Sequence, residues 1–154
     1  MEQAHKSIHI KKKDTYLALI RNSVGTKTFR NIFAKVDGKK KDILEDGNLS
    51  CAYYVSSLLT IAGLISGVHA TVSGTVRDLV KNGWIEIKKP KQGAVIVWEN
   101  VDFGLGEVHG HIGFYIGDNK AVSNDYKKGC PAIHGWTYNG KRKIKTIFWN
   151  QNIG

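Results

Sequence analysis

The hydrophobic periodicity changes at Trp84, and this change restricts the possible folds more than any other feature of the sequence. In residues 55–65 the apolar side chains recur at helical spacing and so share one helical face. Beyond Trp84 the patterns are those of strands: residues 94–98 are continuously apolar, and residues 111–116 alternate before a turn. Helices followed by hairpin-linked strands predict an α+β fold, with the helices packed on a largely antiparallel sheet.

Glycine and turn-forming residues divide the chain into elements. We expect helices at residues 15–22 and 51–65, and a further helix that begins at residue 71 or 73 and ends at 81. A hairpin is expected around Asp37-Gly38, with strands at 29–36 and 39–44, although residues 29–35 also fit a helix. Further strands are expected at residues 84–88, 94–98, 111–116, 120–123, 136–138 and 144–149, with a loop at 125–135. These elements predict a single domain over residues 1–154, with a core from about 48 to 150 and an N-terminal extension at 1–47.

The chain carries a net charge of +10, from 23 Lys and Arg against 13 Asp and Glu. A basic surface attracts anionic polymers, but the sequence has no nucleic-acid-binding motif, so we expect no specific nucleic-acid recognition. The most apolar run, residues 58–68, is too short and too often interrupted by polar residues and glycine to span a membrane. Residues 1–13 lack the apolar segment of a secretion signal, which predicts a cytoplasmic, reduced protein, with non-classical export as the alternative.

Cys51 stands where a polar loop changes into an apolar helix. Ser50 is a favourable N-cap residue, so Cys51 is expected in the first helical turn. The unpaired backbone N–H groups and the helix dipole at this position favour a thiolate over a thiol. The alternative is that Cys51 is a small, buried and inert residue, as free cysteines commonly are.

His111 begins an apolar strand that contains two glycines. Because side chains alternate along a strand, His111, Gly113 and Tyr115 share one face, and Ile112 and Phe114 share the other. If the Cys51 helix packs on the His111 face, Gly113 leaves room for the helix and the imidazole can reach the sulfur. A polar group on the returning strand would then hold the ring.

Four collinear segments together resemble the papain-like NlpC and CHAP cysteine peptidases and amidases, with the CHAP side closer. The resemblance covers about residues 48–124 and rests on Ser50-Cys51-Ala52-Tyr53-Tyr54-Val55, Thr75-Val76-Arg77-Asp78-Leu79 with Asn82-Gly83-Trp84, Pro90-Lys91-Gln92-Gly93-Ala94-Val95-Ile96-Val97-Trp98, and Gly110-His111-Ile112-Gly113-Phe114-Tyr115-Ile116-Gly117. The Asp before the cysteine and the Ser-Gly after it, usual in NlpC enzymes, are replaced here by Ser50 and by Ala52-Tyr53.

The resemblance implies that Cys51 is the nucleophile, His111 the base and Asn124 the residue that orients the base, with Ser123 and Asp125 as alternatives. It implies cleavage of amide bonds, with peptidoglycan peptides as substrate and the backbone N–H of Cys51 as oxyanion donor. The alternatives are a toxin-like or effector deamidase or acyltransferase acting on an intracellular protein, and an inactive basic binding module.

Candidate substrate contacts are Tyr53, Tyr54, His109 and Trp136. The two tyrosines also fit the pattern of core aromatics with the hydroxyl at the rim. No cofactor is expected. A metal site is not expected either, because the His109 and His111 pair has only Glu107 nearby, and zinc needs three or four ligands.

Overall fold

The computed structural model describes residues 6–102 and 108–154, with the backbone alone given for residues 101, 102, 108 and 109. The helices are α1 (Lys12–Asn22), α2 (Cys51–Ile61) and α3 (Val72–Lys81), with short 3-10 turns at Tyr138–Gly140 and Gln151–Ile153. The strands are β1 (Phe33–Val36), β2 (Lys39–Asp42), β3 (Ile85–Glu86), β4 (Val95–Asp102), β5 (Val108–Gly117), β6 (Lys120–Asp125), β7 (Cys130–Gly135) and β8 (Ile144–Trp149).

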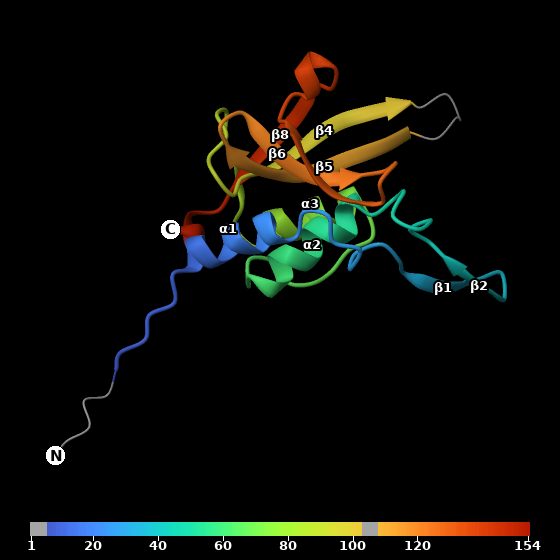
Figure 1. Cartoon of the computed structure of the whole chain (residues 1–154), viewed down its shortest axis with the longest axis horizontal. Helices are drawn as coiled ribbons and strands as arrows, with labels where there is room; N and C mark the ends of the chain where they lie inside the picture. The colour runs from blue at the N-terminus through green and yellow to red at the C-terminus, as the bar shows by residue number, and fades with distance from the viewer. Residues whose placement is uncertain (1–5, 103–107) are drawn as a thin grey trace.

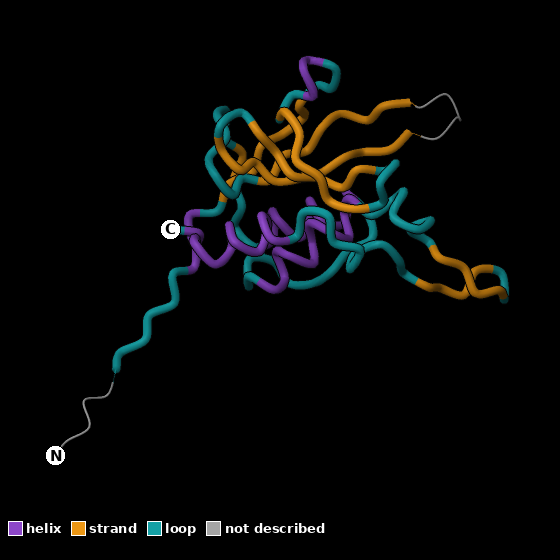
Figure 2. Tube along the Cα trace, in the orientation of Figure 1, coloured by secondary structure: helices purple, strands orange, loops and turns teal. Residues whose placement is uncertain are grey.

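Six of the strands form one antiparallel sheet in the order β3-β8-β4-β5-β6-β7, and the three helices lie together on one of its faces (Figures 1 and 2). The predicted α+β class is confirmed. The main core lies between the two layers, where the rings of Tyr16 and Tyr54 meet Phe114 edge to face with centroids 6.0 and 5.6 Å away. These aromatic contacts fix how α1 and α2 sit on β5.

The alternation predicted for β5 holds, but the helices cover the face opposite to His111. Ile112 and Phe114 are fully buried in the core under the helices. The other face carries a second, smaller cluster formed by Ile96, Trp98 and Ala121, with Tyr138 packed against it. The ring of His111 lies on this side, with its centroid 5.2 Å from that of Trp98. The expectation that the Cys51 helix packs on the His111 face is therefore wrong.

Two predicted helices need correction at their ends. α2 ends at Ile61 instead of near residue 65, because the chain turns at Gly63, whose φ of +68° is outside the helical range. α3 begins where expected, with the Thr71 side chain accepting a hydrogen bond from the Gly74 N–H. Val80 is exposed on this helix, whereas the polar residues Thr75 and Asp78 are buried.

The loop predicted at 125–135 contains β7, and the strand predicted at 136–138 is a turn. Pro131 made this segment unlike a strand, since proline cannot donate to a ladder. β7 tolerates it because it is the edge strand and pairs only with β6. The turn that follows carries Tyr138 back over the second face of the sheet.

The hairpin predicted at Asp37-Gly38 is present as β1 and β2, shorter than expected, and it forms a separate two-stranded sheet. It projects from the rest of the chain, beside the end of the sheet at which α2 begins (Figure 1). Within the described ranges, no helix has both the length and the apolar character needed to cross a membrane.

Candidate active site

Cys51 is the first residue of α2, and its sulfur lies at a gap between two strands. The ladder between β5 and β6 ends at the pair Gly113–Ser123. Residues 110–112, which precede Gly113 on β5, therefore have no partner on β6. The sulfur occupies this position: its thiol donates to the carbonyl oxygen of Gly110 at 3.9 Å, and the backbone N–H of Ile112 donates to it. The backbone groups that hold the thiol therefore belong to the two residues flanking His111.

The local electrostatics do not favour the thiolate that the helix start alone predicts. Burial raises the pKa of Cys51 above its ordinary value of 9.0. The N–H groups of Ile112, Ala52 and Cys51 and the positive charge of Arg142 lower it by less. Ser50 is not an N-cap through its side chain either, because its hydroxyl donates to the carbonyl oxygen of Arg30 at 3.4 Å.

His111 is held by two hydroxyl groups on the second face of the sheet. Its Nε2 lies 2.9 Å from the Ser123 hydroxyl and 2.8 Å from the Tyr138 hydroxyl, and these two oxygens are 2.9 Å apart. Ser123 is also 2.7 Å from Nε2 of His134, whose ring stacks on Tyr138 at a centroid distance of 3.9 Å. One serine hydroxyl thus connects two histidines.

The directions of these hydrogen bonds follow from the far end of the network. The Gly135 carbonyl only accepts, so His134 donates to it from Nδ1 at 2.8 Å, and neutral His134 accepts at Nε2. The Ser123 hydroxyl therefore donates to His134 and accepts from its other neighbours. Three contacts among His111, Tyr138 and Ser123 then need hydrogens. A proton on Nε2 of His111 together with the Tyr138 hydroxyl proton satisfies two of them, whereas a proton on Nδ1 would leave the tyrosine hydrogen alone and satisfy one.

The histidines are kept neutral by their surroundings. Burial lowers the pKa of His111 from 6.5 to about 3, and the charges of Arg142 and His134 add smaller contributions in the same direction. Burial also lowers the pKa of His134. Burial raises the pKa of the Tyr138 hydroxyl, and the hydrogen bond between Tyr138 and Ser123 partly offsets this rise. The neutral tautomers inferred above are therefore the stable forms near pH 7.

Asn124, expected to orient His111, makes a different contact. By strand alternation it lies on the helical face, where its amide donates to the Gly47 carbonyl at 2.7 Å. This bond holds the loop before α2 against β6. Of the alternatives, Ser123 contacts the imidazole, while Asp125 accepts from the backbone N–H groups of Lys127 and Lys128 in the following turn.

The four expected substrate contacts lie in different surroundings. Tyr54 is fully buried and shares a hydrogen bond of 2.7 Å with Ser23, so it is a core residue. Tyr53 is half-buried and packs edge to face on Phe29. Trp136 is half-buried on the His111 side of the sheet, where its carbonyl accepts from the Trp98 indole at 2.9 Å. The side chain of His109 lies outside the described residues.

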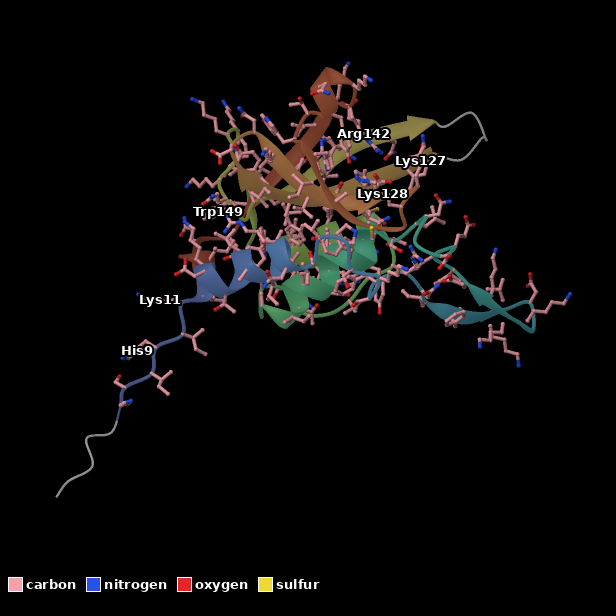
Figure 3. All side chains as sticks on the ribbon, in the orientation of Figure 1. His9, Lys11, Lys127, Lys128, Arg142 and Trp149 are labelled. Carbon is pink, nitrogen blue, oxygen red and sulfur yellow. The ribbon has the colours of Figure 1, made fainter. Side chains whose placement is uncertain are left out.

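Tyr138 and Arg142 belong to the candidate site, although no pattern in the sequence singles them out. Both follow β7, more than 25 residues after His111, and only the folded chain brings them to the sulfur and the imidazole. Figure 3 shows Arg142 above the sheet, on the side away from the helices. In the part of the chain that the structure describes, no three His, Cys, Asp or Glu side chains are grouped to hold a metal ion.

The chain was compared with protein-family models and with curated proteins. No protein-family model matches the chain, and no curated protein matches it significantly. The function has to be argued from the site itself.

Proposed function

We propose that the chain is a papain-like cysteine hydrolase of the NlpC and CHAP type, with Cys51 as nucleophile and His111 as base. One observation carries the proposal: the thiol is held by the Gly110 carbonyl and the Ile112 N–H, so it lies at the position of His111 along β5. A nucleophile beside a base that is itself oriented by a third polar group is the arrangement on which acyl transfer by cysteine depends.

Ser123 and Tyr138 take the orienting role in this proposal. Their hydroxyls engage Nε2 of His111, which leaves Nδ1 as the nitrogen that exchanges a proton with the sulfur. Burial raises the pKa of the thiol and lowers the pKa of the imidazole to about 3, so both changes favour the neutral pair over a resting thiolate–imidazolium pair. His111 therefore takes the proton while the sulfur attacks, and not before.

The reaction is amide hydrolysis in two steps. The Cys51 sulfur forms a bond to the carbonyl carbon, its proton passes to His111, and His111 gives that proton to the leaving amine. Water then cleaves the thioester with His111 as base. The backbone N–H groups of Cys51 and Ala52 lie at the sulfur, at the positive end of α2, and would donate to the oxyanion.

Peptidoglycan peptides are the proposed substrate class, on the strength of the family resemblance. The net charge of +10 is compatible with the anionic cell envelope. The test is incubation of the purified chain with peptidoglycan fragments, followed by measurement of newly released amino groups and the masses of the products. We expect release by the native protein and by Cys130→Ala, and none by Cys51→Ala.

The same test separates chemistry from binding. His111→Gln should reduce kcat by about 10²- to 10⁴-fold, the usual contribution of a positioned acid or base. Release that persists in Cys51→Ala would exclude the cysteine mechanism. The substrate assignment fails if Cys51-dependent cleavage occurs only with protein amides.

A second candidate is a binding module that has the same site but does not catalyse a reaction. The raised pKa of Cys51 and the lowered pKa of His111 favour it, since both groups are inert in their resting forms. Alkylation of Cys51 in a Cys130→Ala background discriminates the two. The binding module is supported if the alkylation rate rises only at a pH above the ordinary pKa range of thiols and if no wall peptide accelerates it.

A further inference from the structure

The β1–β2 hairpin projects from the domain as a basic arm with no partner in the described chain. The ten residues from Phe33 to Asp42 include four exposed lysines: Lys35, Lys39, Lys40 and Lys41. Among the residues that the structure describes, none of the four forms an ion pair. Figure 2 shows the arm as a separate pair of strands directed away from the sheet.

The arrangement of these lysines costs stability in the isolated protein. Lys35 and Lys40 are directly opposite each other in the ladder, and like charges in that position repel. Asp42, at the base of the arm, forms no ion pair with these lysines in the described chain; its carboxylate accepts from the Asn31 amide and from the N–H groups of Ile32, Leu44 and Asp46. Asp42 instead anchors the base of the arm, so that the positive charge is presented on a fixed ribbon.

An exposed aromatic ring lies among the charges. Phe33 is 62% exposed, and the Lys40 ammonium lies 4.7 Å from its ring centroid. By alternation and register, Phe33, Lys35 and Lys40 share one face of the ribbon. These three residues, with Ala34 and Gly38, line a shallow hollow of about 450 Å³. An aromatic ring beside ammonium groups offers a stacking surface and phosphate contacts in one place.

The basic surface continues from the arm to the turn between β6 and β7. Arg30, just before the arm, donates to the carbonyl oxygens of Lys128 and Gly129 at 2.8 and 3.1 Å. Lys127 and Lys128 are exposed in that turn, at the end of the sheet from which the arm projects (Figure 3). Lysines therefore lie on both sides of Arg30 at this end of the molecule, and Arg30 itself pairs with Asp46 at 3.8 Å.

We propose that the β1–β2 hairpin is an arm that binds single-stranded nucleic acid without sequence preference. The lysines neutralise phosphates, and the Phe33 ring stacks on an unpaired base. A phosphate polymer without bases would gain nothing from Phe33, and a duplex would not present a free base to it. This binding is independent of the proposed hydrolysis.

The test is fluorescence anisotropy with a labelled 20-nucleotide oligo-dT, titrated with the full chain at several NaCl concentrations. Lys35→Gln combined with Lys40→Gln should weaken binding about 25-fold at 0.1 M salt and reduce the log–log salt slope by about 1.4, for two phosphate contacts at ~0.7 each. The charge-matched control is Lys88→Gln with Lys89→Gln, two exposed lysines between β3 and β4, which should leave both quantities nearly unchanged.

Phe33→Leu identifies the ligand class, because it keeps the apolar bulk and removes the aromatic ring. It should weaken oligo-dT binding by about 5- to 150-fold, the range expected for one stacked base, while binding of inorganic polyphosphate stays the same. Equal losses from the two lysine pairs would overturn the proposal in favour of diffuse attraction. Equal affinity of native protein and Phe33→Leu for oligo-dT would assign the arm to a phosphate polymer instead.

Discussion

The neutral state of His111 makes the stability of the folded protein depend on pH in a calculable way. The pKa of the ring is about 3 in the folded protein, against an ordinary value of 6.5 in the unfolded chain. Above pH 6.5 both states hold a neutral ring, and the pH has no effect through this residue. Below pH 6.5 His111 binds a proton in the unfolded chain but not in the folded protein. The free energy of unfolding therefore falls as the pH is lowered, until about pH 3.

At pH 5 this difference corresponds to about 2 kcal/mol of lost free energy of unfolding, as an upper value. The partial exposure of the ring lets water reduce it, so we expect about 1–2 kcal/mol. His111→Gln removes the titration and keeps a donor for the Ser123 and Tyr138 hydroxyls. The acid loss should therefore be smaller in this variant than in the native protein by that amount.

The assay is urea unfolding of both proteins at pH 7.5 and pH 5.0, followed by far-UV circular dichroism. Other acid-sensitive groups, including His134 and Asp78, are present in both proteins and cancel in the comparison. His9→Gln, which changes an exposed histidine in the N-terminal segment, is the matched control. If the native protein and His111→Gln lose equal free energy between the two pH values, burial does not hold the ring neutral and the reasoning fails.

Two further predictions concern the stability of the fold. Gly113→Ala should lower the free energy of unfolding by about 1–3 kcal/mol in urea melts, because its Cβ would lie 2.7 Å from the Ser123 Cβ and the Val122 carbonyl; Gly67→Ala, with open space around it, is the control. Asp78→Asn should lower it by about 3 kcal/mol, since the buried carboxylate accepts from the N–H groups of Ser66 and Gly67 and the new amide would face donors; an unchanged urea midpoint would refute this.

The sequence was sufficient to predict the parts of the site that depend on local pattern. Apolar spacing predicted a helix starting at Cys51, and alternation predicted a strand with His111 and Ile112 on opposite faces. Neither pattern says which face a helix will cover, because both faces of β5 carry apolar or aromatic residues. That choice depends on packing between distant segments, and there the expectation was wrong.

The residue that contacts His111 from β6 shows a second limit. Ser123 and Asn124 are adjacent in sequence, so a count from His111 cannot separate them, and their roles follow from the register between β5 and β6. Pairing of Ser123 with Gly113 puts the serine on the His111 face and the asparagine under the helices. Tyr138 was beyond prediction for a different reason: it reaches the imidazole from a turn whose path no local signal specifies.

The early end of the β5–β6 ladder links strand pairing to the position of the thiol. One additional pair, Ile112 with Asn124, would give the Ile112 N–H to a neighbouring strand and remove the backbone donor that contacts the sulfur. Such a change would keep Cys51, His111 and Ser123 in the sequence and yet remove the contact that places the thiol at the level of His111 along β5. Under the proposed mechanism, a single backbone pairing would therefore decide whether the chain can react, without any replacement among these three side chains.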